Sequence, residues 1–274
     1  GGAPVDFFKQ KTAYAIHERL VGSEMCIRDR FMPIREISED FSIDDIVPYF
    51  QPIVDLQSQG VWRYECLARL ITRGDKTFLP SEFLYLIERE QHVNTLAASM
   101  FVQCASYFHD VNIPWNINIT ANDLHNIELT NTLITHLASY PTPERVSIEV
   151  SASTALSNPK SLTAFIEKSM HVGLGVFIDN VGSCPGNIRA LMNLPVRGIK
   201  LAGGLIKHYD EQEAVREYVD YLLSLCERHG VSTIAEHVED EAHLERVKRL
   251  PIRYAQGYVF SPPMANVRSA TARH

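Results

Sequence analysis

The chain has 274 residues, 45% of them hydrophobic and 22% charged, and a formal net charge of -7 at pH 7. This is the composition of an ordinary globular protein, and the acidic balance argues against a nucleic acid polymer as partner, because non-specific binding needs a basic face. No apolar run approaches the ~20 residues of a membrane helix, so no membrane partner is expected. The five cysteines form no Cys-x-x-Cys pair, which predicts reduced, mostly buried thiols in a cytoplasmic protein.

The first thirty residues differ from the rest of the chain. They have neither a strand nor a helix period long enough to join a core, and they lack the apolar centre of a signal peptide. The runs FKQKTAY and LVGSEMCIRDR resemble a peptide translated from sequencing-adapter DNA. We therefore expect residues 1–31 to be non-native or a disordered leader, with a natural start at Met32. We predict a lead-in over 32–44, one domain over 45–266 and a C-terminal tail over 267–274.

From Met32 onwards, short apolar strands alternate with helical segments. Only QSQG separates the first two predicted strands, 49–56 and 61–70. Because a parallel pair needs a crossover of about a dozen residues or more, these two strands must form an antiparallel hairpin. Further strands are predicted at 115–119, 145–150, 175–179, 196–201, 231–235 and 254–260. Helices are predicted at 80–109, 124–138, 159–171, 187–193, 212–229 and 240–249.

This alternation predicts a closed barrel. The last seven of the eight predicted strands are separated by segments long enough to hold helices, a pattern that fits a barrel better than an open doubly wound sheet. No GxGxxG motif follows the first strand, so a dinucleotide-binding sheet has little support. The predicted fold is α/β, a TIM-like (β/α)8 barrel whose first strand runs antiparallel to the others.

Most of the predicted strands end near a carboxylate, an amide or an amine. In barrels of this kind the chemistry lies at the C-terminal ends of the strands. The residues at these ends are Glu65, Asn118, Glu149, Asp179, Lys200, Glu236 and Gln256. The first four offer hard oxygen ligands for one Mg²⁺, Mn²⁺ or Ca²⁺ ion. A lysine beside a metal and carboxylates can move a proton or hold an activated water, so the set suits hydrolysis of a phosphodiester.

Seven short motifs, in order and with the right spacing, resemble those of the bacterial EAL domain over about residues 45–265. That family includes the phosphodiesterases that linearise cyclic di-GMP, and its barrel also has one antiparallel strand. The motifs are YFQPIVDL with YECLAR at 49–69, NITA at 118–121, IEVSA at 148–152, DNVG at 179–182, IKLA at 199–202, AEHVE at 235–239 and QGYVF at 256–260.

The resemblance implies a set of metal ligands. Glu65, Asn118, Glu149 and Asp179 match the ligands of a first metal, Mg²⁺ or Mn²⁺. Asn180 stands where the family has an aspartate that binds a second metal. An amide offers an oxygen but no charge, so we expect a second ion to bind more weakly here.

The resemblance also implies catalytic and substrate-binding residues. Lys200 matches the lysine that positions or deprotonates the attacking water, and Glu236 and Gln256 match a carboxylate and an amide of the active site. Arg69 matches an arginine placed to contact a phosphate of cyclic di-GMP, a role that suits the guanidinium fork. Gln51, in the opening motif, is a second candidate for substrate binding.

Several departures from the family pattern leave the activity open. Besides Asn180, Ala152 replaces a glutamate that holds the following loop, and the loop at 182–187 differs and contains Pro185. The main hypothesis is a slow cyclic di-GMP phosphodiesterase. The alternatives are a catalytically silent cyclic di-GMP receptor and a module that binds a protein partner, and a homodimer is expected by analogy with the family.

Overall fold

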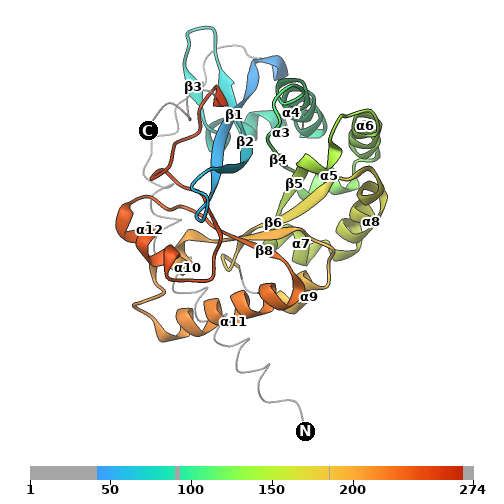
Figure 1. Cartoon of the computed structure of the whole chain (residues 1–274). Coiled ribbons are helices and arrows are strands. Elements are labelled where there is room, and N and C mark those ends of the chain that lie inside the picture. Colours follow the sequence, from blue (N-terminus) through green and yellow to red (C-terminus); the bar gives the residue numbers. More distant parts are fainter. Residues whose placement is uncertain (1–41, 90–92, 185, 268–274) are drawn as a thin grey trace.

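The computed structural model describes residues 42–89, 93–184 and 186–267. The predicted leader 1–31, most of the lead-in and nearly all of the C-terminal tail lie outside these residues. Within them, nine strands form one sheet, and eight of the nine close into a barrel with helices around it (Figure 1). The strands are β1 (Ile46–Asp55), β2 (Val61–Ile71), β3 (Thr77–Phe78), β4 (Trp115–Asn118), β5 (Val146–Ser151), β6 (Gly175–Val181), β7 (Gly198–Leu201), β8 (Ser232–Ala235) and β9 (Tyr254–Ala255).

The order of the strands confirms the predicted barrel with one antiparallel member. Around the barrel the order is β1-β9-β8-β7-β6-β5-β4-β2, and pairing of β1 with β2 closes it. β1 runs antiparallel to both of its neighbours, whereas the other barrel strands are parallel to one another. The short strand β3, absent from the predicted elements, pairs antiparallel with β2 outside the barrel.

The helices lie between the strands and cover the outside of the barrel. They are α3 (Pro80–Arg89), α4 (Val93–Tyr107), α5 (Ala121–His125), α6 (Ile127–Ala138), α7 (Ala152–Ser157), α8 (Pro159–Ser169), α9 (Ile188–Met192), α10 (Gly203–Lys207), α11 (Glu213–His229) and α12 (Glu241–Lys248). None of the helices in the described ranges is long and apolar enough to cross a membrane.

Capping side chains divide segments that hydrophobic period alone predicts as single helices. The predicted helix at 124–138 is two helices, because Asn126 ends α5 and its side chain then accepts a hydrogen bond from the Leu129 N–H at the start of α6. α7 is a further short helix absent from the prediction, and it begins where Ser151 caps it by accepting from Thr154. The predicted helix at 80–109 is also two helices, α3 and α4, and residues 90–92 between them lie outside the described residues.

The last strand is much shorter than the predicted 254–260. After Ala255 the chain leaves the ladder at Gly257, which passes so close to the neighbouring loop that a Cβ there would lie 2.1 Å from the Val238 carbonyl oxygen. Only glycine allows that approach. The turn keeps Gln256 at the end of β9, with its backbone N–H donated to the Ala235 oxygen.

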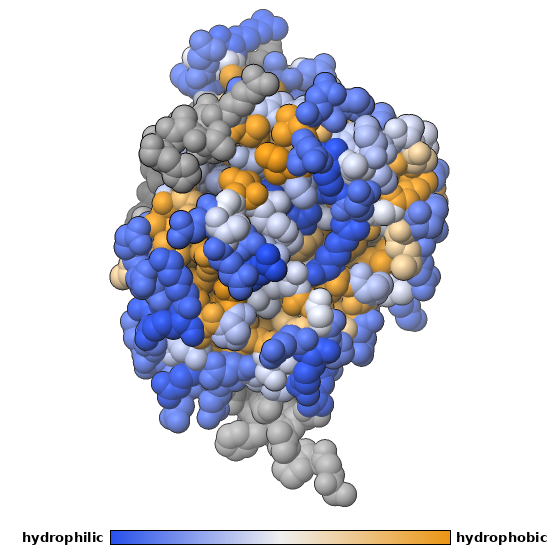
Figure 2. All heavy atoms as spheres, in the orientation of Figure 1, coloured by the Kyte–Doolittle hydropathy of each residue, from blue (hydrophilic) through white to orange (hydrophobic). Residues whose placement is uncertain are grey.

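Apolar packing is concentrated between the strands and the helix layer. Trp115 on β4 is fully buried and packs against Phe101 of α4 and Phe108 just after it, with ring centroids 5.7 and 5.9 Å away. The outer surface is different: Figure 2 shows hydrophilic side chains over α11 and α12, which carry charged residues of both signs. The helices therefore present apolar faces to the barrel and polar faces to solvent.

Candidate active site at the carboxyl ends of the strands

Lys200 on β7 lies at the centre of a group of carboxylates. Its side chain is fully buried, and its Nζ atom is 2.7 Å from Glu65 Oε2 on β2 and 2.8 Å from Glu149 Oε2 on β5. Glu236 Oε1, just after β8, is 3.1 Å away, and Asp179 Oδ1 on β6 is 3.7 Å away. Five predicted site residues from five different strands or the residue just after one therefore meet in one place; Glu65 lies in the middle of the long strand β2, and the other four lie near the ends of their strands.

Amide side chains also donate to carboxylate oxygens of the same group. Asn118 Nδ2 donates to Glu65 Oε1 at 2.8 Å, and Gln256 Nε2 donates to Glu65 Oε2 at 2.7 Å. Gln256 Nε2 also lies 3.0 Å from Gln51 Oε1, which joins the two predicted glutamines. Glu65 is thus held by one ammonium and two amides, and its carboxylate is fixed in position.

The electrostatics of the group follow from crowding buried carboxylates around one ammonium. Burial opposes the charge of Lys200, but the four carboxylates outweigh it and hold its pKa well above the usual value. Burial would also raise the pKa of Glu65, but the Lys200 ammonium and the amide hydrogen bonds hold it below its usual value. Burial and the charge of Glu65 raise the pKa of Glu149 to about 8, and burial raises that of Glu236 well above its usual value. One carboxylate ionises readily while others retain protons.

The end of β6 is irregular at the two residues predicted to bind metals. The pairing of β6 with β7 shifts register between Ile178 and Val181, which leaves Asp179 and Asn180 unpaired on the β7 side, although Asp179 still pairs with Ser151 of β5 on the other side. Asn180 has a positive φ of 57°, a conformation that asparagine tolerates better than most residues. Its carbonyl oxygen accepts hydrogen bonds from Ser183, so the backbone of Asn180 anchors the following loop.

Arg69 lies apart from the carboxylate group. It is on β2, four residues beyond Glu65, and therefore about 13 Å further along the strand. Its Nη1 atom donates to the Ala68 carbonyl oxygen at 2.7 Å, and its guanidinium carbon is 5.8 Å from the centroid of the Tyr49 ring. The structure thus brings Gln51 into the hydrogen-bonded group but leaves Arg69 at its edge.

The donor chemistry of the group fits a divalent cation. Glu65, Asn118, Glu149 and Asp179 all offer hard oxygens, and Asp179 Oδ1 is buried without a hydrogen-bond donor among the described residues. As the side chains lie, no group of three or more His, Cys, Asp or Glu in the described ranges is arranged to hold a metal ion. In this arrangement the Lys200 ammonium lies between the carboxylates and within 3.1 Å of three of them. A cation would have to share these oxygens with Lys200.

The sequence patterns missed a second layer of polar residues inside the barrel. Asn116, fully buried, donates from Nδ2 to Glu149 Oε1 at 2.5 Å. Arg63 and Ser147 are also buried, and each lies two residues before a predicted metal ligand on its strand. Side chains two residues apart point to the same side of a strand. The sequence did carry a sign of this layer: Arg63, Asn116 and Ser147 each precede a predicted metal ligand by two positions.

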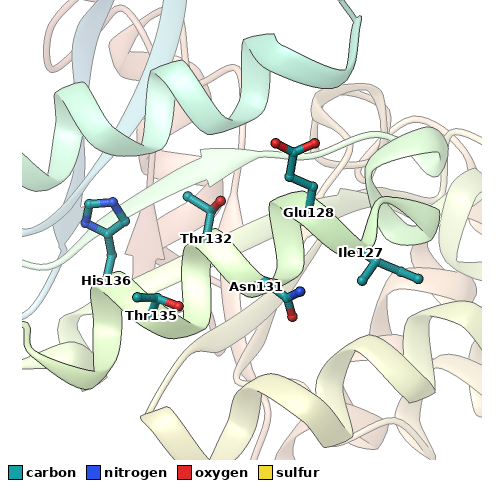
Figure 3. Close-up of a pocket in the computed structure, with 6 residues that line it drawn as sticks. All are labelled: Ile127, Glu128, Asn131, Thr132, Thr135 and His136. Atoms are coloured by element: carbon teal, nitrogen blue, oxygen red, sulfur yellow. The ribbon is translucent and has the colours of Figure 1, made fainter.

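A surface pocket lies elsewhere on the molecule. It has a volume of about 580 Å³ and is lined by residues of α6, among them Ile127, Asn131 and His136 (Figure 3). No residue of the carboxylate group lines it, and Ile127 is 69% exposed. The pocket is a feature of the outer helix layer, and the chemistry-bearing residues gather in the barrel instead.

A protein-family model described as the EAL domain matches residues 34–263. Among known proteins, the chain is 25% identical over 246 residues to "Cyclic di-GMP phosphodiesterase RocR" of Pseudomonas aeruginosa. The match covers 84% of this chain and 62% of that relative, so the chain spans less than two thirds of the relative's length.

Solved structures share the fold. The EAL domain of FimX from Pseudomonas aeruginosa, bound to c-di-GMP, aligns with a TM-score of 0.74 and 20% identity, covering 81% of this chain and 92% of that one. An EAL domain protein from Listeria monocytogenes aligns with a TM-score of 0.75 and 21% identity, covering 86% and 99%. At these identities the likeness establishes the barrel and its topology.

Proposed function

We propose that this chain, which belongs to the EAL domain family, hydrolyses cyclic di-GMP to linear pGpG in a slow, metal-dependent reaction. The observation that carries the proposal is the convergence of four carboxylates on Lys200 at the carboxyl ends of the barrel strands. Support for the substrate comes from RocR, which is named a cyclic di-GMP phosphodiesterase, and from the FimX domain, which was solved with c-di-GMP bound.

EAL phosphodiesterases are metal-dependent in general, and a bound Mg²⁺ or Mn²⁺ ion would supply charge neutralisation and an activated water. The residues proposed to hold a first ion are Glu65, Asn118, Glu149 and Asp179. The polar, buried setting favours this role, because carboxylates that lie without water need a cation nearby.

The remaining predicted site residues are proposed to bind the dinucleotide and to orient the reacting groups. Lys200 donates to both Glu65 and Glu149 and so fixes the positions of the two carboxylates relative to each other. Its proposed role in the reaction is to hold the attacking water. Glu236 is the candidate to exchange a proton with the reacting groups. Gln256 and Gln51 form an amide pair beside Glu65 that can bond to the ligand. Arg69, at the edge, suits a phosphate oxygen of the dinucleotide.

The proposed slowness rests on Asn180. Two metal ions clamp the attacking and leaving oxygens in two-metal sites. Asn180 brings no charge to a second ion, and its backbone already anchors the β6–α9 loop in a left-handed conformation. Weak binding of the second ion would remove several kcal/mol of transition-state stabilisation.

The test is a phosphodiesterase assay with cyclic di-GMP and Mn²⁺, in which linear pGpG is quantified by chromatography. The wild-type chain should turn over slowly, and Glu65→Gln, which keeps the size of the side chain but removes its charge and one acceptor oxygen, should abolish turnover. Asn180→Asp should raise the rate at least about tenfold, about 1.4 kcal/mol or more. Ala152→Glu is a poorer reversion, because Ala152 is only 2% exposed at the start of α7 and a glutamate there would be buried.

Other results would favour the alternatives. Calorimetric binding of cyclic di-GMP without turnover by either wild type or Asn180→Asp would indicate a receptor. Absence of binding, with a partner still captured by the Glu65→Ala, Arg69→Ala double variant, would indicate a protein-interaction module. Arg69→Lys should weaken cyclic di-GMP binding about tenfold while leaving Mn²⁺ binding unchanged, because lysine keeps the charge but loses the fork. The proposal also includes a cytoplasmic location and a homodimer, as predicted from the sequence. Sedimentation of the purified chain tests the dimer.

A further inference from the structure

Arg63 is a buried cation inside the barrel that the proposed reaction does not use. It is on β2, and its side chain is 3% exposed. Its Nη2 atom reaches only neutral acceptors, the Arg145 carbonyl oxygen and Ser147 Oγ, each at 3.4 Å. Its Nε and Nη1 atoms have no hydrogen-bond partner among the described residues. A buried guanidinium without an adjacent carboxylate is costly, so some other favourable field must hold it there.

A β-bulge and two aromatic rings fix the position of Arg63. Opposite β1, Ile53 pairs with Arg63 and Val54 pairs with Val61, so Trp62 is an extra residue on β2. The guanidinium carbon of Arg63 is 4.7 Å from the centroid of the Trp62 ring and 4.5 Å from that of Phe177. Trp62 in turn stacks on Tyr254 with centroids 3.7 Å apart. The rings offset part of the cost of burying the charge through cation–π contact.

The register of the strands places this charge beneath the carboxylate group. Arg63 and Glu65 share one face of β2, and Ser147 and Glu149 share one face of β5. Because Arg63 contacts Ser147, its guanidinium lies one side-chain layer below the two glutamates, about 7 Å away along the strands. Burial lowers the pKa of Arg63 to about 10, and the Glu149 carboxylate opposes that decrease, so Arg63 is protonated at neutral pH.

The charges of the site explain why a second buried cation is stabilising. When all four carboxylates are ionised, as binding of a divalent cation by their oxygens requires, Glu65, Glu149, Asp179 and Glu236 contribute -4 and Lys200 contributes +1, a sum of -3. Arg63 reduces this to -2 without occupying any carboxylate oxygen. We propose that Arg63 is a fixed counter-charge beneath the metal site, which stabilises the metal-free carboxylate group and lowers its affinity for a divalent cation. Arg63 would be a positioning residue, and the inference rests on the proposed function in assuming a metal at this group.

Metal binding without nucleotide tests the inference directly. Calorimetry with Mn²⁺ alone compares the wild type with Arg63→Met, which removes the charge but keeps much of the length, and Arg63→Lys, which keeps the charge. Since a unit charge acts on a divalent ion across about 8 Å of protein, Arg63→Met should bind Mn²⁺ roughly tenfold more tightly or better. Arg63→Lys should bind about as the wild type does. Equal or weaker Mn²⁺ binding by a folded Arg63→Met variant would overturn the inference.

The unfolding stability of the Arg63 variants, measured with and without Mn²⁺, is a second test. If Arg63 only filled space, the stability lost on its replacement would not depend on Mn²⁺. In chelator Arg63→Met should unfold at lower urea concentration than the wild type, and saturating Mn²⁺ should recover much of the difference. If Arg63→Met loses the same stability with and without Mn²⁺, the proposed role of Arg63 as a counter-charge is wrong. If Arg63→Met does not fold in either condition, the same comparison with the neutral, hydrogen-bonding Arg63→Gln decides.

The outcomes separate this inference from the proposed reaction. A wild-type chain that binds Mn²⁺ but does not convert cyclic di-GMP would refute the reaction and leave the Arg63 comparison intact. If neither the wild type nor the neutral variants bind Mn²⁺, the counter-charge inference fails on that ground alone.

Discussion

Replacing Glu149 with glutamine should change how the stability of the metal-free protein depends on pH. Glu149 is fully buried, and burial and the neighbouring Glu65 charge raise its pKa from the usual 4.5 to about 8. The folded state binds this proton more tightly than the unfolded state does. The contribution of the protonated Glu149 to folding stability is therefore fully present below pH 4.5 and is lost as the pH rises to about 8. At about 1.4 kcal/mol per pKa unit, the folding stability lost across this pH range is about 4 to 5 kcal/mol.

The Glu149→Gln variant resembles the protonated form and should not show this loss. Its amide oxygen can accept from Lys200, as Glu149 Oε2 does at 2.8 Å. Its amide NH₂ needs an acceptor, and Asn116 Oδ1 is buried without a partner among the described residues. Rotation of the Asn116 amide by 180° would supply that acceptor. Near pH 5 the variant should therefore match the wild type within about 1 kcal/mol, and near pH 8 it should be several kcal/mol more stable.

The assay is urea unfolding in chelator at pH 5, 6, 7 and 8. Taking the difference between wild type and Glu149→Gln at each pH removes the contribution of the histidines, which titrate in the same range. At an m-value of roughly 2 to 3 kcal/mol/M, the expected difference at pH 8 corresponds to roughly 1.3 to 2.5 M in the urea midpoint. Glu128→Gln, an exposed carboxylate on α6, is the matched control and should follow the wild type. A difference of the same size at pH 5 and pH 8 would refute the reasoning.

Two further changes test other parts of the structure. Lys200→Met leaves buried carboxylates without their ammonium, so in chelator it should lose about 3 to 5 kcal/mol of stability at pH 7. Much of this stability should return near pH 5, because without the ammonium burial favours the protonated form of Glu65. Urea unfolding at both pH values measures the loss, and equal losses would contradict the reasoning. His237 has a φ of 55°, a conformation that is unfavourable for a residue with a Cβ but not for glycine. His237→Gly should therefore stabilise the protein by about 0.5 to 1 kcal/mol. A lower urea midpoint for the variant would show that the backbone there is unstrained.

Local patterns in the sequence determined the architecture. The QSQG connection is too short for a crossover, which makes β1 and β2 antiparallel, and the later connections are long enough for helices. Polar residues at the ends of apolar strands identified the residues that meet around Lys200. These inferences succeeded because loop length and the two-residue period of a strand are properties of neighbouring residues.

Only the tertiary structure decided how these side chains meet. The position of Lys200 among four carboxylates, the approach of Asn116 to Glu149 and the burial of Arg63 beneath them all depend on register between strands far apart in the chain. The bulge at Trp62 and the irregular end of β6 alter that register locally, and no period in the sequence announces them. The strand ends could thus be read as a group of polar residues, whereas the charge balance within that group is set by the closed barrel, which removes the side chains from water and brings them within hydrogen-bonding distance.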